Sequence, residues 1–594
     1  MSLRLLTACG PDARVVMARA KIPTSHIPMG IMQEAQDPGV GVREGVDDDW
    51  CANGADPAIC GQHYSAPGSF MHNMGKGLAL TKLTAAIPLQ LANFPGPFWG
   101  SVTDLHLFLA INSIPTNGLA LHEKYGDIIR IAPNLLSFSD PKLLPEVYHT
   151  QADKTPFYSS WLFSDTVGMF QTLDHRKHAA LFKIINPCCS LKALSKFEGR
   201  IDEQIDGLCA QLGQKCKTGK SVDFVEYVSH IAYGKPLGCV DQGRDVGGLI
   251  DAIQSIYPMV GTVAVLPQIF IPIFNNRFCR RFINPHLKPF REIQKHFDVE
   301  LRPPDPTPPN RYDSKPPPPR LFDPLRSNPS VSPDLLRAEH ILFTSAALDG
   351  LAAFIAPFIH HTTSSPRIYH LLTSEISQAA NLSSPVATYE ETLSLPYFSA
   401  CVAETLRFEA PAQTILPRYV PQGGLMWKGR LIPSGTEMGA SPFIIHRNRA
   451  VFGDDADCFR PERWLLPDDD DDDNTRLENA ATSPNPNPNS QKSETRRQAL
   501  HRTKTMEKYG MWWGYGTRVC AGKNLAQMQM RKVCLEVLRR FDVRAVLDGE
   551  GKAFRHERWA VGMFWDQRMV FEERERGRGE GGIFSKVRQN AAEG

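Results

Sequence analysis

The sequence predicts a mainly helical fold with a small β region. From Phe94 onward, apolar residues recur at helical spacing between short breakers, and helix signals greatly outnumber strand signals. The stretch 418–436 has a β-like pattern within this region. The length of 594 residues fits one continuous core with insertions. We therefore expect one large helical domain.

The composition is that of a soluble globular enzyme. Hydrophobic residues make up 42% and charged residues 22%, with a net charge of +2, so nothing in the whole chain favours a nucleic-acid partner. No secretory signal opens the chain, and no stretch has the roughly 20 uninterrupted apolar residues of a spanning helix. The nearest, 78–94, is broken by Lys82 and Pro88 and suits at most a surface-lying segment.

Composition also sets the domain limits. Residues 1–75 lack a sustained period and are expected to be a poorly ordered extension, and residues 576–594 a disordered tail. The domain between them, 76–575, contains two low-complexity insertions. Residues 303–333 are rich in proline, and residues 467–503 contain six consecutive aspartates.

A glycine-punctuated loop at 513–522 ends where a helix, roughly 520–541, begins. Cys520 would lie at the N-terminus of this helix, where unpaired N–H groups and the helix dipole favour thiolate over thiol. Gly514, Gly516 and Gly522 let the backbone approach a flat cofactor, and Arg518 can pair with a carboxylate. Taken alone, a cysteine beside glycines is equally well a buried structural residue.

Two further segments carry paired charges. Glu404 and Arg407 lie three residues apart on a helix expected to begin near Leu395-Pro396, which places them on one face. Arg463 follows in the turn-like segment 459–464. Arg418 and His446 lie between these two segments.

In this order and spacing, the residues resemble the cytochrome P450 family of haem-thiolate oxygenases over roughly residues 94–575. The loop matches the family signature, with Trp513 in place of the usual phenylalanine. Glu404 and Arg407 match the E-x-x-R pair, and Arg463 completes its structural triad. The segments 94–97, 122–126 and 365–367 are similar to fungal members of the benzoate-hydroxylase or pisatin-demethylase type.

The resemblance implies one haem b with Cys520 as the axial ligand of the iron. Arg518 and Arg418 would contact the haem propionates, and His178 stands where the family often has a tryptophan with that duty. Four positions later this chain has Phe182 where the family usually has an arginine, so one propionate contact is missing from the pattern. The triad would brace the cysteine loop and take no chemical step.

The distal motif departs from the family. It falls on Ala346 to Leu351, where Asp349 supplies the usual acid but Gly350 and Leu351 replace both alcohols that help to deliver protons to dioxygen. Three interpretations stay open. In the first, water or a substrate hydroxyl at Gly350 replaces the alcohol, and Asp349 still delivers protons with help from Ser345. In the second, the protein catalyses a rearrangement or dehydration. In the third, it is a weakened haem-binding paralogue.

By resemblance, the protein inserts one oxygen atom of dioxygen into a small organic substrate, of the aromatic or secondary-metabolite kind. The residues expected to line the pocket are Phe343, Asp349, 412–416 and 559–564. The chain has no dinucleotide fingerprint or P-loop, so electrons must come from another protein, by resemblance an NADPH-dependent flavoprotein reductase. We expect a monomer that is cytoplasmic or peripheral on the endoplasmic reticulum membrane.

A basic face is the candidate docking surface for the reductase. Arg518, Lys523, Arg531 and Lys532 lie around the cysteine loop and its helix. A solvated helix face explains the same residues equally well.

Overall fold

The computed structural model describes residues 89–104, 107, 114–161, 166–218, 221–223, 261, 263–264, 321–379, 382–467, 494–546, 555–558, 561–565 and 567–574. The predicted extension 1–75 and tail 576–594 lie outside the described residues, as do residues 303–320 and 468–493 of the two predicted insertions.

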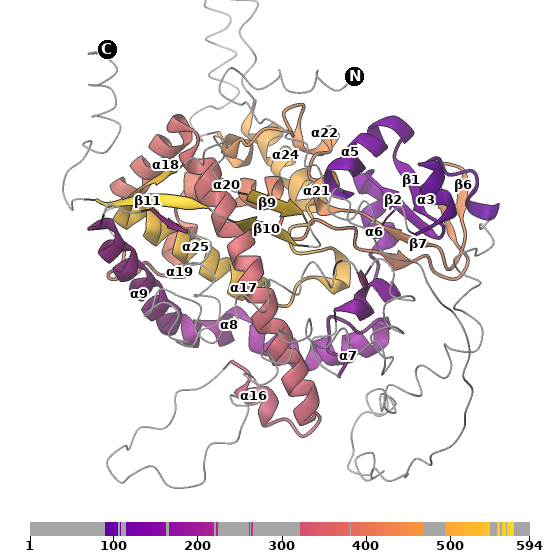
Figure 1. Ribbon diagram of the computed structural model, residues 1–594, viewed down its shortest axis with the longest axis horizontal. Coiled ribbons are helices and arrows are strands. Elements are labelled where there is room, and N and C mark those ends of the chain that lie inside the picture. The colour runs from indigo at the N-terminus through magenta and orange to yellow at the C-terminus, as the bar shows by residue number, and fades with distance from the viewer. Residues whose placement is uncertain are drawn as a thin grey trace, which may run out of the picture. The chain divides into compact units, whose positions relative to one another are not determined.

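Helices dominate the described part of the chain (Figure 1). They are α3 (Phe98–Val102), α5 (Ile114–Tyr125), α6 (Leu144–Val147), α7 (His175–Ile185), α8 (Leu191–Leu194), α9 (Glu198–Cys216), α16 (Asp323–Arg326), α17 (Pro333–Thr363), α18 (Pro366–Gln378), α19 (Tyr389–Leu393), α20 (Pro396–Phe408), α21 (Pro442–Ile445), α22 (Arg449–Phe452), α24 (Arg496–Tyr509) and α25 (Lys523–Arg540). The mainly helical prediction is confirmed.

The strands form small sheets. One joins β1 (Ile128–Ala132), β2 (Leu135–Phe138), β7 (Glu437–Gly439) and β4 (Arg418–Tyr419) in that order, with β2 and β7 parallel and the other pairs antiparallel. A second joins β3 (Val222–Asp223), β11 (Arg568–Glu573) and β8 (Phe541–Ala545). Two hairpins pair β5 (Leu425–Trp427) with β6 (Arg430–Ile432), and β9 (Arg555–Arg558) with β10 (Gly562–Trp565).

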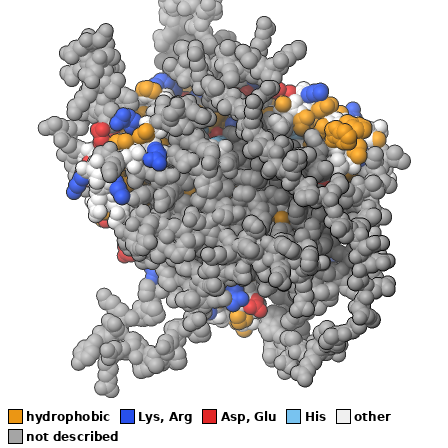
Figure 2. Space-filling view, viewed as in Figure 1, with side chains coloured by type: hydrophobic (Ala, Val, Ile, Leu, Met, Phe, Trp, Pro, Cys, Tyr) orange, Lys and Arg blue, Asp and Glu red, His pale blue; other side chains and the backbone are white. Residues whose placement is uncertain are grey.

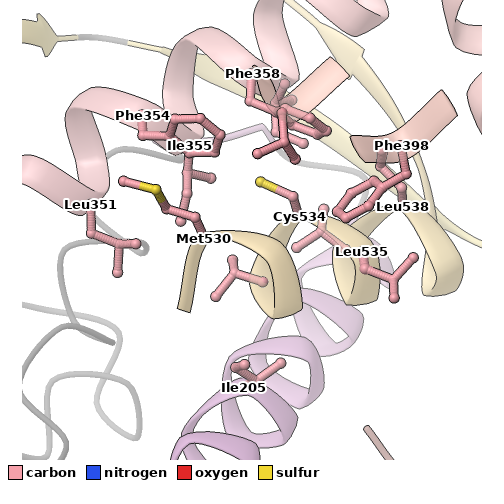
Figure 3. Close-up of a cluster of buried hydrophobic side chains, with 14 of the residues drawn as sticks. Ile205, Leu351, Phe354, Ile355, Phe358, Phe398, Met530, Cys534, Leu535 and Leu538 are labelled. Carbon is pink, nitrogen blue, oxygen red and sulfur yellow. The ribbon is translucent and has the colours of Figure 1, made fainter. Parts of the chain in front are cut away.

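The helix α17 is the centre of the core. Ser332 caps its first turn by accepting a hydrogen bond from the Leu335 N–H, and Pro333 takes the first position, where a missing N–H costs nothing. Figure 3 shows Leu351, Phe354, Ile355 and Phe358 of α17 facing Met530, Cys534, Leu535 and Leu538 of α25, with Phe398 of α20 and Ile205 of α9 alongside. This packing on several sides explains why the helix is apolar nearly all round.

By length and composition, α17 is the only helix among the described residues that could cross a membrane. Its most apolar window is 78% buried inside the protein, as expected for a core helix.

The last part of the predicted acidic insertion is helical. Residues 496–503, assigned to the insertion 467–503, form the first half of α24. A capping box starts this helix, in which Thr495 accepts from the Gln498 N–H and the Gln498 side chain accepts from the Thr495 N–H. Likewise, the end of the proline-rich stretch 303–333 contains α16 and the first residue of α17.

Candidate functional site

The cysteine loop is closed by backbone contacts. The Cys520 N–H donates to the Trp513 carbonyl at 2.8 Å, and Gly514 and Gly516 adopt φ values of +81° and +69° that favour glycine. A Cβ on Gly516 would lie 1.9 Å from the Tyr148 carbonyl oxygen, so no larger residue fits there. The loop is therefore pressed against the segment that contains Tyr148.

Cys520 lies just before α25, which begins at Lys523 with Gly522 as its N-cap, three residues later than predicted. Burial raises the pKa of the Cys520 thiol, while the backbone amides of Gly522 and Lys523 act in the opposite direction. The residue is nevertheless exposed. The Cys520 sulfur is therefore open to contact by a group that is not part of the chain.

Three cations, Arg418, Lys154 and Arg518, meet beside this loop. Arg418 is 4% exposed and donates to the Tyr158 hydroxyl at 2.6 Å, while the Lys154 ammonium lies 4.3 Å from the centre of the Tyr158 ring. Arg518 donates to the Leu173 carbonyl, which also accepts the Lys154 N–H. Shared partners thus hold the three residues together.

Burial and neighbouring positive charges lower the pKa values of Arg518, Lys154 and His178. Burial, followed by Arg418, lowers the pKa of Arg518 to about 10, and burial lowers the pKa of Lys154 well below its usual range. His178 joins them on α7, where burial and then Arg518 lower its pKa to about 3. Its ring stacks on Phe182, with the ring centres 5.9 Å apart.

The predicted charge triad forms. The fully buried Glu404 carboxylate accepts two hydrogen bonds from Arg407, both at 2.8 Å, and one from the Arg463 Nε at 3.0 Å. The Arg460 N–H and the Trp464 indole N–H also donate to this carboxylate. Each guanidinium has backbone carbonyl partners as well. Such full pairing is what makes three buried charges tolerable.

His446 connects the triad to the cysteine loop. Its Nδ1 donates to the Arg407 carbonyl at 3.0 Å, and its Nε2 accepts from the Met511 N–H at 2.9 Å. A carbonyl only accepts and an amide only donates, which fixes this tautomer of the neutral ring. The ring also stacks on Trp512 at 4.7 Å. Sequence analysis noted His446 only by position, and nothing in its neighbours signals this link.

The distal segment lies inside α17, as predicted. Asp349 is 7% exposed, and Ser345, one turn earlier, is fully buried. A Cβ added to Gly350 would meet no atom within 4 Å. The backbone at the missing alcohol therefore adjoins open space that a side chain, a water molecule or a substrate group can fill.

Comparisons with known proteins identify this arrangement. The family model "Cytochrome P450" matches residues 93–563. The chain belongs to the cytochrome P450 family. A cytochrome P450 monooxygenase of Aspergillus terreus is 27% identical, with 77% of this chain and 92% of the relative covered. The monooxygenase pkfB of Emericella nidulans is 26% identical, with 79% and 90% covered.

A third relative, the quiannulatic acid synthase of Emericella variicolor, is 29% identical over 63% of this chain and 78% of the relative. A cytochrome P450DA haem domain has the same fold, with a TM-score of 0.60, 15% identity, and 79% of this chain and 95% of that chain covered. The protein is thus a haem-thiolate monooxygenase, an oxidoreductase whose haem iron has a cysteine thiolate ligand and whose electrons come from a redox partner.

The residues present fit haem. Among the described residues, no carboxylate forms an ion pair with Lys154, Arg418 or Arg518, and the Nε of Arg418 has no hydrogen-bond partner. Lys154 and Arg418 are buried and Arg518 is partly buried, and these three cations without an ion pair match the two propionates of one haem. Lys154 was missed from the sequence. It supplies a cation to the cluster, in which Phe182 stands where the family has an arginine.

Two further residues of the cysteine loop, Trp513 and Gly522, were predicted to lie at the haem. Trp513, partly buried, packs against the main core cluster, while its neighbour Trp512 makes the contact with His446. Gly522 lies close to the sulfur, since an added Cβ would be in van der Waals contact with the Cys520 Sγ at 3.8 Å.

The docking prediction is wrong for Lys532. Its side chain is fully buried, with its ammonium 2.6 Å from Glu198 and 2.5 Å from Asp202 of α9. Arg531 is turned inward too, and donates to the Thr392 carbonyl and the Ser399 hydroxyl. Of the residues proposed on α25, Lys523 alone is exposed.

The segments predicted to line the substrate side approach α17. Phe564 of β10 packs on Ala352 and Ala356 of α17, and Ala412 pairs with Val561 in a β-bridge. Phe343 packs instead on Phe322, with ring centres 5.0 Å apart. Residues 559–560 lie outside the described part of the chain.

Proposed function

We propose that Cys520 is the axial ligand of the haem iron and that the protein inserts one oxygen atom of dioxygen into a small organic substrate. The observation that carries the proposal is the position of Cys520. Its exposed side chain lies in the same loop as Arg518 of the cation cluster, and the backbone amides of Gly522 and Lys523 act on its sulfur. The cluster matches the propionates and the thiol matches the iron.

Each residue then has a defined task. Haem, when bound, supplies dioxygen activation, and a thiolate ligand favours cleavage of the O–O bond. Lys154, Arg418 and Arg518 hold the propionates through charge-assisted hydrogen bonds. His178 lies against this group as a neutral ring and fills the space beside it.

Asp349 moves protons on the substrate side. Asp349 is buried in α17 directly before Gly350, and a water molecule or a substrate hydroxyl in the open space at Gly350 would stand for the missing alcohol. This support favours oxygenation over the rearrangement, the dehydration or the inactive haem binder.

The substrate belongs to the aromatic or secondary-metabolite class. Apolar side chains such as Ala352, Ala356 and Phe564 meet where the segments predicted for the pocket approach α17. The similar quiannulatic acid synthase is named for an acid. Hydrophobic walls with few polar groups suit such compounds.

The electron donor is an NADPH-dependent flavoprotein reductase, which a monomeric oxygenase meets on the cysteine side. Lys523 belongs to the predicted docking face and is exposed at the start of α25, so its positive charge can attract an acidic reductase.

The protein is intracellular and rests peripherally on a membrane of the endoplasmic reticulum. Phe98 and Trp99 of α3 are 71% and 64% exposed, and Met426 and Leu431 of the β5–β6 hairpin are 61% and 55% exposed. Figure 2 shows hydrophobic side chains gathered at the upper right, where Figure 1 places α3 and β6. Aromatic residues favour the bilayer interface.

Co-sedimentation with phospholipid vesicles should fall in Trp99→Ser, and equal binding would contradict the attachment.

The test of the function is turnover with benzoate as the first probe. Haem-loaded protein, a fungal flavoprotein reductase, NADPH and isotopically labelled dioxygen should give a product that carries one labelled oxygen atom. The variant Asp349→Asn should form less product and keep its haem. Haem binding and reduction without an oxygenated product from benzoate or related aromatic acids would favour the inactive binder.

A further inference from the structure

A cavity of about 320 Å³ lies beneath α5, apart from the haem site. Its walls come from α5, from β1 and from the segments that contain Ile415 and Ile444. Neither Cys520, the buried cations nor Asp349 lines it. Its volume lies at the small end of the range for ligand pockets.

The interior of this cavity is apolar. Ile129 is fully buried, and Ile131, Ile415 and Ile444 are 6% or less exposed. The one buried polar group of the wall, the Ser137 hydroxyl, is already hydrogen-bonded to the His122 Nε2 at 2.9 Å. A ligand therefore need not form hydrogen bonds in the interior, and burial of its CH₂ groups there stabilises the complex.

The rim differs from the interior. Asn117, Ala120 and Lys124 of α5 line the cavity and are exposed, so they mark its opening. Of all the lining residues, Lys124 is the one with a charged side chain. An apolar interior with one cation at its mouth is complementary to an aliphatic chain that ends in an anionic head.

The opening adjoins the exposed apolar surface of α3. Pro97, which lines the cavity, is the N-cap of α3 and directly precedes Phe98 and Trp99. Gly118 brings α5 close to Ile444, since an added Cβ would lie 2.8 Å from the Ile444 Cδ1. The helix backbone therefore forms part of the wall, and a chain leaving the cavity meets apolar side chains outside.

We propose that this cavity binds the chain of a single-chain anionic amphiphile, such as a fatty acid, with its carboxylate at Lys124. The site is a second ligand site of the protein: it shares the segment 412–416 with the predicted substrate pocket through Ile415, while its other walls come from the N-cap of α3, from α5, β1 and β2 and from the segment that contains Ile444. It requires no chemical step.

The experiment is calorimetric titration of the haem-loaded protein with dodecanoate. A bulky azole that ligates the haem iron is kept at saturation, so that the substrate pocket is closed. One dodecanoate per chain should still bind, and affinity should rise about fourfold per CH₂ along the series of shorter carboxylates until the cavity is full. Loss of all binding when the azole is added would place the fatty acid in the substrate pocket and overturn the proposal.

Two variants locate the site independently. Leu121→Trp fills the cavity and should weaken binding at least tenfold, whereas the volume-conserving Leu121→Met should bind as the parent does. Lys124→Glu should weaken binding about threefold, the order expected for an exposed ion pair, and Lys142→Glu, an exposed lysine outside the cavity, should have no effect.

Unchanged binding in both Leu121→Trp and Lys124→Glu would exclude this cavity. Displacement of dodecanoate by vesicles that contain lysophosphatidylglycerol, a single-chain lipid, would identify a membrane lipid as the source of the chain, and lack of displacement a free fatty acid.

Discussion

The His446 side chain connects the buried charge triad to the cysteine loop. We therefore expect His446→Ala to destabilise the packing of this loop. The substitution leaves the Arg407 carbonyl and the Met511 N–H without their partner, at roughly 1–3 kcal/mol each. It also removes the stack on Trp512, worth roughly 0.5–1.5 kcal/mol. Water entering the space would satisfy part of the loss, so we expect about 3–5 kcal/mol of destabilisation.

The assay follows the ligand itself. A chain of this size with a cofactor does not unfold in two states, so we would measure the urea midpoint at which the reduced, carbon-monoxide-bound protein loses its thiolate-type band. His446→Gln keeps a donor and an acceptor and should recover part of the stability. His370→Ala removes an exposed histidine of α18 and is the matched control. Equal midpoints for His446→Ala and His370→Ala would refute the link.

The same residue predicts a pH dependence. Burial, and then Arg407, lower the pKa of His446 to about 3 from an ordinary value of 6.5. The unfolded chain therefore binds a proton below about pH 6.5 that the folded protein rejects. The contribution is complete above pH 6.5 and is lost as the pH falls toward 3. The urea midpoint of His446→Gln should thus fall less steeply with acid than that of the parent, and parallel curves would contradict this origin.

Three other outcomes are expected. Gly350→Thr, whose Cβ has room, should lower peroxide leakage and raise product per electron, and unchanged coupling would show that proton delivery is not limiting. Lys154→Met should speed transfer of haem to a haem-free acceptor by about 10- to 100-fold, while Lys154→Arg retains it; equal rates would remove Lys154 from the propionate site. Lys523→Glu should slow reduction by the reductase most at low salt, whereas Lys532→Gln should lower stability with no such salt effect.

The parts of the site that the sequence predicts are those with local spacing. Glu404 and Arg407 share one face of α20 because they lie three residues apart, and the glycines around Cys520 demand a tight loop wherever it packs. These features need no knowledge of distant segments. The helical body follows in the same way from periodic apolar residues.

The parts that the sequence misses depend on distant partners. Lys154 belongs to the cation cluster because it lies near Arg418 and Arg518, which come from other parts of the chain. No sequence motif includes Lys154 together with either arginine. Lys532 looks like a surface residue of α25 until Glu198 and Asp202 of α9 are placed against it. The start of α24 is different, since Thr495 and Gln498 form a readable capping box that the surrounding polar composition obscured.

The most direct test of haem ligation by Cys520 is the carbon monoxide difference spectrum of the reduced protein, compared with that of Cys520→Ser. We expect a thiolate-type band in the parent and its loss in the variant, with haem still held by Lys154, Arg418 and Arg518. A thiolate-type band that survives in Cys520→Ser, or that is absent from folded, haem-loaded parent protein, would contradict ligation of the haem by Cys520.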